Sequence, residues 1–395
     1  MRITKRVPFV VATAFLVTAI VGCPSAEVQQ AETLKKKIET LKKKTEAIEQ
    51  CMKALEQSQA HVKNGDVGKA IADCSEAIRF NPVCVRAYCC RGMCYSLMGD
   101  HDKAIDDCNE AIRLDPSLAA AFSSRGACYC SKHDYDKAFA DCSEAIRLDP
   151  RYADAYSIRA SIYKKKGNFD KAIADYNEVI HLNPKRAMAY CSRGTLYEHK
   201  GAHDKAIVDL TEAIRLDPKF AYAYCCRGMT YGGMGNRDKE IADCTEAIRL
   251  DSKCAVAYYS RGCAYKDKGD CDKAIADFSQ AIRLNPKYAL AYANRAYAHL
   301  SKGNNDAAIT DYDEAIRLDP KNATAYYSRG YVYKNKGDFD KAINDFSQAI
   351  RLNPKDALAY YHRGLAHKAK GDKSKAEADF AEAKKLRHAE KREAN

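Results

Sequence analysis

The sequence contains 395 residues, of which 46% are hydrophobic and 30% are charged, and its formal net charge is +12. That excess is modest for the length and partly local, since it gathers in Lys35–Lys37, Lys42–Lys44 and the C-terminal tail. A nucleic-acid-binding protein needs a basic stripe along one face, and the sequence between these clusters has none, so we expect no nucleic-acid partner.

Residues 1–22 have the organisation of a secretory signal peptide. A short basic start precedes an apolar run over residues 7–21, which is shorter than the roughly 20 residues that a membrane-spanning helix needs. The run ends in Ile20-Val21-Gly22-Cys23, which resembles the lipobox of bacterial lipoproteins. The resemblance implies that residues 1–22 are removed and that Cys23 carries the lipid, such as palmitate, that tethers the chain to a membrane.

The same resemblance implies a location in the bacterial cell envelope. Pro24 follows the cysteine, where an aspartate would indicate retention in the inner membrane, so we expect an outer-membrane lipoprotein facing the periplasm. There are two alternatives. Residues 1–22 could be an uncleaved anchor helix, or the chain could be a cytosolic adaptor whose N-terminus is not a signal peptide.

Residues 23–50 form a lysine-rich spacer that is strongly helical after Ser25. Apolar or small residues follow a spacing of four and three, as in a coiled-coil heptad, at Leu34, Ile38, Leu41, Thr45, Ile48, Met52 and Leu55. We expect this helix to extend the first helix of the following domain and to pack locally. Pairing with a partner or with a second copy is the alternative.

Residues 51–390 consist of ten copies of a 34-residue unit, followed by a polar tail at 391–395. A closing proline recurs every 34 residues, with Ser252 in the one gap, at Pro82, Pro116, Pro150, Pro184, Pro218, Pro286, Pro320 and Pro354. A fixed period of this length is typical of a solenoid, which grows by stacking units rather than by enlarging one core.

The unit at 323–356 predicts two amphipathic helices. Helix A is expected over residues 324–336 and ends at Gly337, because glycine adopts the left-handed conformation without strain. Helix B is expected to begin at Asp340, and Pro354 prevents its continuation. One such pair buries too little apolar surface alone, so each unit needs neighbours.

The unit resembles the tetratricopeptide repeat (TPR). The residues that carry the resemblance are Tyr326, Gly330, Tyr333, Ala342, Phe346, Ala349 and Pro354. The resemblance implies an all-α protein, a right-handed TPR superhelix of about ten helix-turn-helix repeats. The first and last copies depart from the pattern, as capping repeats do.

Two charged positions recur beyond the family pattern. Every copy has an aspartate on helix B, such as Asp345, and every copy but the first has an arginine on helix A, such as Arg329. A planar guanidinium suits a bidentate carboxylate, so we predict a structural ladder of Arg–Asp pairs within or between repeats.

In TPR proteins, partner contacts often lie on the concave face, one, two and five residues after the first aromatic residue of helix A. Such positions are rich in tyrosine in the last four repeats, and tyrosine is common in binding surfaces. The predicted partner-binding residues are Tyr259, Cys263, Asn294, Tyr297, Tyr327, Ser328, Tyr331, Tyr361 and His362. The alternative is that these tyrosines pack against the next helix A.

The 18 cysteines show no zinc-site spacing and no Cys-x-x-Cys pair, and equivalent cysteines of neighbouring repeats are predicted to lie too far apart for a disulfide. We interpret most of them as small buried hydrophobes. No catalytic motif appears, and we expect no catalytic residue, metal, cofactor or small-molecule substrate. The sequence therefore predicts a non-enzymatic scaffold for protein or peptide partners of the cell envelope. A thiol-based metal or redox module on the same scaffold is the alternative.

Overall fold

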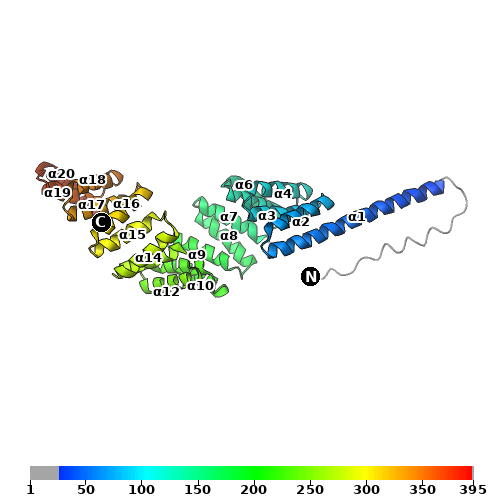
Figure 1. The fold of residues 1–395 in the computed structure, drawn as a ribbon, viewed down its shortest axis with the longest axis horizontal. Helices are drawn as coiled ribbons and strands as arrows, with labels where there is room; N and C mark the ends of the chain where they lie inside the picture. The colour runs from blue at the N-terminus through cyan, green and yellow to red at the C-terminus, as the bar shows by residue number, and fades with distance from the viewer. Residues whose placement is uncertain (1–25, 394–395) are drawn as a thin grey trace. The chain divides into compact units, whose positions relative to one another are not determined.

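The computed structural model describes residues 26–393, and all regular structure in that range is α-helical (Figure 1). The predicted signal peptide and Cys23 lie outside the described residues. None of the helices in residues 26–393 is both long and apolar enough to cross a membrane.

The described helices follow one another in helix-turn-helix pairs, as the repeat pattern predicts. The first helices of the pairs, helices A, are α1 (Ala26–Lys63), α3 (Val85–Leu97), α5 (Ala119–Ser131), α7 (Ala153–Lys165), α9 (Ala187–His199), α11 (Ala221–Gly233), α13 (Ala255–Asp267), α15 (Ala289–Ser301), α17 (Ala323–Asn335) and α19 (Ala357–Ala369). The second helices, helices B, are α2 (Val67–Phe80), α4 (His101–Leu114), α6 (Tyr135–Leu148), α8 (Phe169–Leu182), α10 (His203–Leu216), α12 (Arg237–Leu250), α14 (Cys271–Leu284), α16 (Asn305–Leu318), α18 (Phe339–Leu352) and α20 (Lys373–Glu393).

The turn between α17 and α18 shows why each pair forms where it does. Gly337 has a φ of 81°, which ends helix A, and the Asp338 side chain then accepts a hydrogen bond from the Lys341 amide and caps helix B. Both helices begin one residue earlier than the sequence predicts, because the capping residues are Asn322 and Asp338.

The core of each repeat combines small residues with one larger side chain of helix B. Ala342, Phe346 and Ala349 are fully buried on α18. A Cβ atom on Gly330 would lie only 3.1 Å from Asp345 Cβ and Phe346 Cε1, so the glycine permits the close approach of α17 to α18.

The chain divides into two units, Met1–Ile162 and Tyr163–Asn395, with the boundary inside α7. Within the second unit, helix B of each repeat packs against helix A of the next, and adjacent helices A also contact one another from α9 to α19. Adjacent helices B in residues 163–393 make no comparable contact, so the helices A form a continuous row on one side of this unit.

The Arg–Asp ladder is confirmed in eight repeats, each time within one repeat. The pairs are Arg91–Asp107, Arg125–Asp141, Arg193–Asp209, Arg227–Asp243, Arg261–Asp277, Arg295–Asp311, Arg329–Asp345 and Arg363–Asp379. In the first repeat, which has no such arginine, Asp73 contacts His61 Nδ1 at 2.6 Å instead.

The same arginines also reach the preceding repeat. Their Nη1 atoms donate to polar side chains that lie 16 residues earlier, on helix B of that repeat: Ser75, Asn109, Asn177, Thr211, Thr245, Ser279, Asp313 and Ser347. The last repeat has Ala381 at this position. The ladder therefore joins helices within a repeat and repeats to one another.

The spacer and the first helix A form one helix, α1, of 38 residues. Cys51, Ala54 and Leu55 are buried at its C-terminal end, beside α2. The expectation that the heptad residues pack locally is wrong for residues 34–48, which are largely exposed, because α2 has only 14 residues and covers only one end of α1.

Candidate partner-binding surface

The predicted partner-binding residues all lie on α13, α15, α17 and α19, four successive helices A of the second unit. The structure places them in two polar and aromatic clusters. One joins α13 to α15, and the other joins α17 to α19.

The first cluster is centred on Asn294. Lys266 Nζ donates to Asn294 Oδ1 at 2.9 Å, while Asn294 Nδ2 donates to the Tyr259 hydroxyl at 3.2 Å and to the Leu290 carbonyl at 3.0 Å. The Lys266 ammonium also lies 5.5 Å from the centre of the Tyr297 ring, within the range of a cation–π interaction. These contacts fix the orientation of a lysine and an amide on the helix-A row.

The second cluster is centred on His362. Its ring lies 5.3 Å from Tyr331 and 5.8 Å from Tyr327, both in edge-on geometry, and it stacks on Phe346 at 6.0 Å. Lys334 Nζ lies 3.5 Å from His362 Nδ1 and 4.4 Å from the centre of the Tyr331 ring. Aromatic rings therefore surround one histidine and hold one ammonium group.

The electrostatics of this cluster favour a neutral imidazole. Burial lowers the pKa of His362 to about 4, and the positive charges of Lys334 and Arg387 act in the same direction. A neutral imidazole accepts a hydrogen bond at Nδ1, which suits the adjacent Lys334 ammonium. The positive charge of the cluster thus lies on Lys334 and Arg387.

The two lysines differ in their carboxylate neighbours. Lys266 Nζ lies 3.7 Å from Asp267, which is also paired with Arg237. Among the carboxylates of residues 28–389, none lies within ion-pair distance of Lys334. Lys334 is therefore the better candidate for an external carboxylate.

Several predicted contacts serve packing instead. Tyr259 packs on Phe278 and Tyr288, and Tyr327 packs on Phe346, beside the buried cores of their repeats. Tyr259 and Cys263 pack against the same buried core of Ala274, Phe278 and Ala298. The packing alternative thus describes Tyr259 and Tyr327 well.

Other predicted residues remain accessible. Tyr297 is 52% exposed and Tyr361 is 37% exposed. The Tyr361 ring has Arg387 of α20 at 5.3 Å from its centre. These two rings are the accessible aromatic surface beside the two clusters.

Sequence reasoning missed an apolar column in the first turn of helix A. Its large side chains recur at multiples of the 34-residue step and are 41–53% exposed: Met188, Tyr222, Val256, Leu290 and Leu358. They lie four residues before the second predicted contact position, on the same helix face, so the spacing could have revealed them. Lys266 and Lys334 were also missed, although each follows a predicted residue by three.

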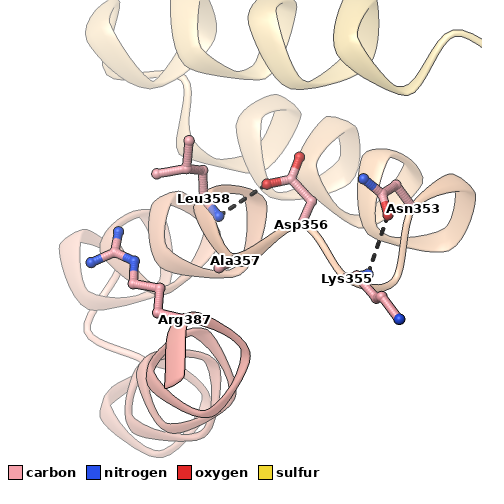
Figure 2. A pocket seen from close by; sticks show the side chains of 6 residues that line it. All are labelled: Asn353, Lys355, Asp356, Ala357, Leu358 and Arg387. Carbon is pink, nitrogen blue, oxygen red and sulfur yellow. Dashed lines mark hydrogen bonds between the residues drawn. The ribbon is translucent and has the colours of Figure 1, made fainter. Parts of the chain in front are cut away.

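A hollow of about 600 Å³ lies between the loop before α19 and α20 (Figure 2). Its polar groups are mostly engaged locally, since Asp356 accepts hydrogen bonds from the Leu358 and Ala359 amides, and Asn353 accepts one from the Lys355 amide. In Figure 2, Arg387 reaches the hollow from α20, the other side. The hollow thus combines the cationic side chains of Arg387 and Lys355 with the Asp356 carboxylate.

Several non-equivalent cysteines interact, which sequence reasoning did not anticipate. The prediction that equivalent cysteines lie too far apart for a disulfide concerns other pairs. In four pairs one thiol shifts the pKa of the other: Cys51 and Cys84, Cys74 and Cys90, Cys191 and Cys226, and Cys225 and Cys254. All are free thiols, and no group of three or more metal-ligating residues is assembled within residues 26–393.

The consecutive helix-turn-helix pairs define an all-α helical-repeat protein. Sequence models described as tetratricopeptide repeat match residues 85–118, 119–152, 153–186, 187–220, 221–254 and 357–388. A model described as TPR repeat matches residues 262–303, 298–337 and 332–371. The chain belongs to the tetratricopeptide repeat family, which confirms the prediction from the repeat unit.

One of the matching solved structures supports the fold. The Cut9–Hcn1 hetero-tetramer of the APC/C matches with a TM-score of 0.51 at 16% identity, over 84% of this chain and 86% of that one. A TPR protein from Parabacteroides merdae matches at 20% identity and a TM-score of 0.49, over 63% of this chain and 98% of that one. YrrB, described as a TPR protein with an unusual peptide-binding site, matches at 22% identity and a TM-score of 0.39, over 48% of this chain and 97% of that one. A search among curated proteins gives no match.

Proposed function

We propose that this TPR protein is a non-enzymatic scaffold that binds a protein or peptide segment along the helices A of its last four repeats. The observation that carries the proposal is Lys334, an ammonium held against Tyr331 and His362 with no carboxylate of the described residues beside it. A carboxylate of a partner would complete this group, since charge-assisted hydrogen bonds are the stronger ones.

The neighbouring surface indicates the rest of the partner's chemistry. Leu290, Tyr297, Leu358 and Tyr361 are exposed on the same helices. Burying such side chains stabilises a complex by roughly 25 cal/mol for each Å² of apolar surface removed from water. The partner segment therefore carries apolar side chains and at least one carboxylate.

The experiment compares partner capture by matched variants of the full chain, after crosslinking in the cell envelope. The site variant combines Tyr297→Ala, Lys334→Ala and Tyr361→Ala, and we expect it to lose the partner. The control is Val208→Ala on α10, which removes an apolar side chain that is 69% exposed on a helix B. Equal capture by the site variant and the wild type would refute this placement.

We further propose that a lipid on Cys23 holds the repeats at a membrane of the bacterial cell envelope, the outer membrane facing the periplasm. The support is the sequence of residues 1–24, with its basic start, apolar run and lipobox-like ending. Labelled palmitate is expected to enter the wild-type chain and not Cys23→Ala. If the wild-type chain takes up no label and is found in the cytosolic fraction, the result would favour the adaptor alternative.

A thiol-based redox module on the same scaffold is the second candidate, favoured by the four pairs of adjacent thiols. In this case, oxidised glutathione would exchange with a pair, forming one protein disulfide and releasing two molecules of reduced glutathione. Free-thiol counts before and after treatment measure this reaction, with metal content analysed on the same sample. If the number of free thiols does not change and the chain contains no metal, only the scaffold function remains.

A further inference from the structure

The N-terminal part of α1 carries an apolar seam that no described residue covers. The seam consists of Leu34, Ile38, Leu41, Thr45, Ile48 and Met52. Its large members are well exposed: Leu34 by 60%, Ile38 by 38%, Leu41 by 62%, Ile48 by 53% and Met52 by 43%. The seam lies on one continuous helix, because α1 runs unbroken from Ala26 to Lys63.

The spacing of the seam is that of a coiled coil. Its residues alternate by four and three, which puts Ile38, Thr45 and Met52 at heptad position a and Leu34, Leu41 and Ile48 at position d. Position a holds a β-branched residue at Ile38, and position d holds Leu34 and Leu41, a combination that favours two parallel strands.

The positions that flank the seam are all basic within residues 34–45, whereas the last heptad has Glu49 at position e and Cys51 at position g. Lys35 and Lys42 are at position e, and Lys37 and Lys44 are at position g. All four are exposed, and no carboxylate of the described residues pairs with them. Positions e and g set the choice of partner in a coiled coil, so this segment selects for negative charge.

A second copy of the chain fits this segment poorly. In a parallel pair, position g of one strand faces position e of the next heptad on the other. This sets Lys37 against Lys42 of the second copy, and only the next contact, Lys44 with Glu49, joins opposite charges. An antiparallel pair confined to residues 34–45 would also bring lysines together, because all four flanking positions are basic. Like charges at these positions oppose pairing.

A membrane surface also fits less well. Helices that lie in the membrane interface carry a broad apolar face, often with tryptophan or phenylalanine. In α1 the apolar face is the narrow a and d seam, and the helix contains no aromatic residue other than His61. A narrow seam is the geometry of helix pairing.

We propose that the seam of α1 is a docking site for an acidic helix of another protein, which forms a heterotypic two-stranded coiled coil with residues 34–52. The partner helix carries apolar residues at its own a and d positions and glutamates at the e and g positions that face Lys35, Lys37, Lys42 and Lys44. This site consists of other residues than the helix-A surface of the last four repeats.

The test uses the full chain in mild detergent and two labelled synthetic helices of about four heptads each. Both have Ile at position a and Leu at position d, and one has Glu and the other Lys at positions e and g. We expect the acidic helix to bind, with an affinity that falls as salt rises, and the basic helix to bind at least tenfold more weakly.

Two variants of the chain separate pairing geometry from general attraction. Lys37→Glu with Lys42→Glu changes the flanking positions and is expected to weaken binding of the acidic helix at least tenfold. Lys36→Glu with Lys43→Glu makes the same change in net charge at position f, which faces away from the seam, and is expected to keep most of the binding. Far-UV circular dichroism checks that both variants keep their helices.

Three results would overturn the proposal. Equal loss of binding in the two double variants would show unspecific charge attraction. A chain that is dimeric by light scattering and becomes monomeric in Leu41→Asp would show self-pairing. If phosphatidylglycerol vesicles displace the acidic helix and the chain sediments with the vesicles, α1 would be a lipid-binding helix.

Discussion

Arg329 and Asp345 form a bidentate ion pair inside the ninth repeat, in which Nε donates to Oδ2 at 2.8 Å and Nη2 donates to Oδ1 at 2.7 Å. The Asp345 side chain is only 2% exposed, and the arginine side chain is 17% exposed. Burial therefore makes each member of the pair dependent on the other, because an unpaired buried charge is costly. The same geometry recurs along the chain and gives a direct stability prediction.

Asp277→Ala removes one carboxylate of the ladder and leaves Arg261 without its bidentate partner. Breaking a buried pair in this way costs about 3 kcal/mol. We expect a lower urea midpoint and faster hydrogen exchange in α13 and α14.

The matched control for Asp277→Ala is Glu246→Ala on α12. Glu246 pairs with Arg249 three residues away, with the arginine side chain 67% exposed. Exposed pairs contribute less than about 1 kcal/mol, so this variant should resemble the wild type. Equal effects of the two substitutions would contradict a stabilising role of the buried ladder.

Ser279→Ala tests the contact between repeats. Arg295 Nη1 donates to Ser279 Oγ at 2.9 Å, from α15 to α14 of the preceding repeat. Losing this bond costs about 1 kcal/mol, and the coupling of the two repeats weakens because stability in a solenoid depends on nearest neighbours. Ser301→Ala, whose exposed hydroxyl donates within its own helix, is the control. Hydrogen exchange across the α14–α15 junction should increase only in Ser279→Ala.

Comparing Gly262→Ala with Gly233→Ala separates the effect of close packing on stability from the effect of helix propensity. A Cβ on Gly262 would lie 2.8 Å from Phe278 Cε1, whereas the nearest atom to a Cβ on Gly233 lies at 3.6 Å. Overpacking at Gly262 is expected to destabilise the chain by about 1–3 kcal/mol, while alanine at Gly233 should stabilise it by up to about 1 kcal/mol. Thermal unfolding of the two variants gives the sign of each effect.

The repeat period predicts most of this fold because a solenoid has no long-range topology to solve. Each unit contacts its neighbours, so correct helices, turns and small-residue positions in one unit define the others. Arg329 and Asp345 were likewise predictable, since both recur in register. The additional bond from Arg329 to Asp313 was not, because it depends on how two repeats stack.

The candidate site was less predictable for a related reason. Tyr297 and Tyr331 occupy the same position in their repeats, yet Tyr297 is 52% exposed whereas Tyr331 packs edge-on against His362. The environment of each tyrosine depends on the side chains of the next helix A, such as His362 beside Tyr331. The period alone carries no such information.

Cys254 is expected to react first among the buried and half-buried thiols. A hydrogen bond from the Cys225 thiol and the Val256 and Ala257 amides at the start of α13 lower its pKa to about 6. Burial raises the pKa of Cys244, which is fully buried. The thiolate is the nucleophile, so limiting iodoacetamide at pH 7 should modify Cys254 about tenfold faster than Cys244.

Peptide mass spectrometry measures the relative modification of the two cysteines. Cys225→Ser tests the cause, because replacing the thiol that lowers the pKa of Cys254 should change the rate at which Cys254 is modified. Modification of Cys244 at the same rate as Cys254 would contradict the described burial. It would also remove the basis for a redox function of the Cys225–Cys254 pair.

His362 is predicted to titrate far below an ordinary histidine. Burial, Lys334 and Arg387 lower its pKa from 6.5 to about 4 in the folded chain. Between these values the unfolded chain binds more protons than the folded chain, so the histidine's contribution to stability is present above about pH 6.5 and is lost as the pH falls toward 4. NMR titration of the imidazole should give the low value directly.

His362→Gln should therefore reduce the loss of stability of α17–α20 between pH 6.5 and pH 4, since glutamine has no charge to bury. His388→Gln, on the exposed face of α20, is the matched control and should leave the pH dependence as in the wild type. A carboxylate peptide that binds beside Lys334 should raise the pKa of His362, because it offsets the positive charge that now disfavours protonation. An imidazole that titrates near 6.5 in the free chain would show that His362 is solvated, and the cluster around Lys334 would then lack its rigid aromatic frame.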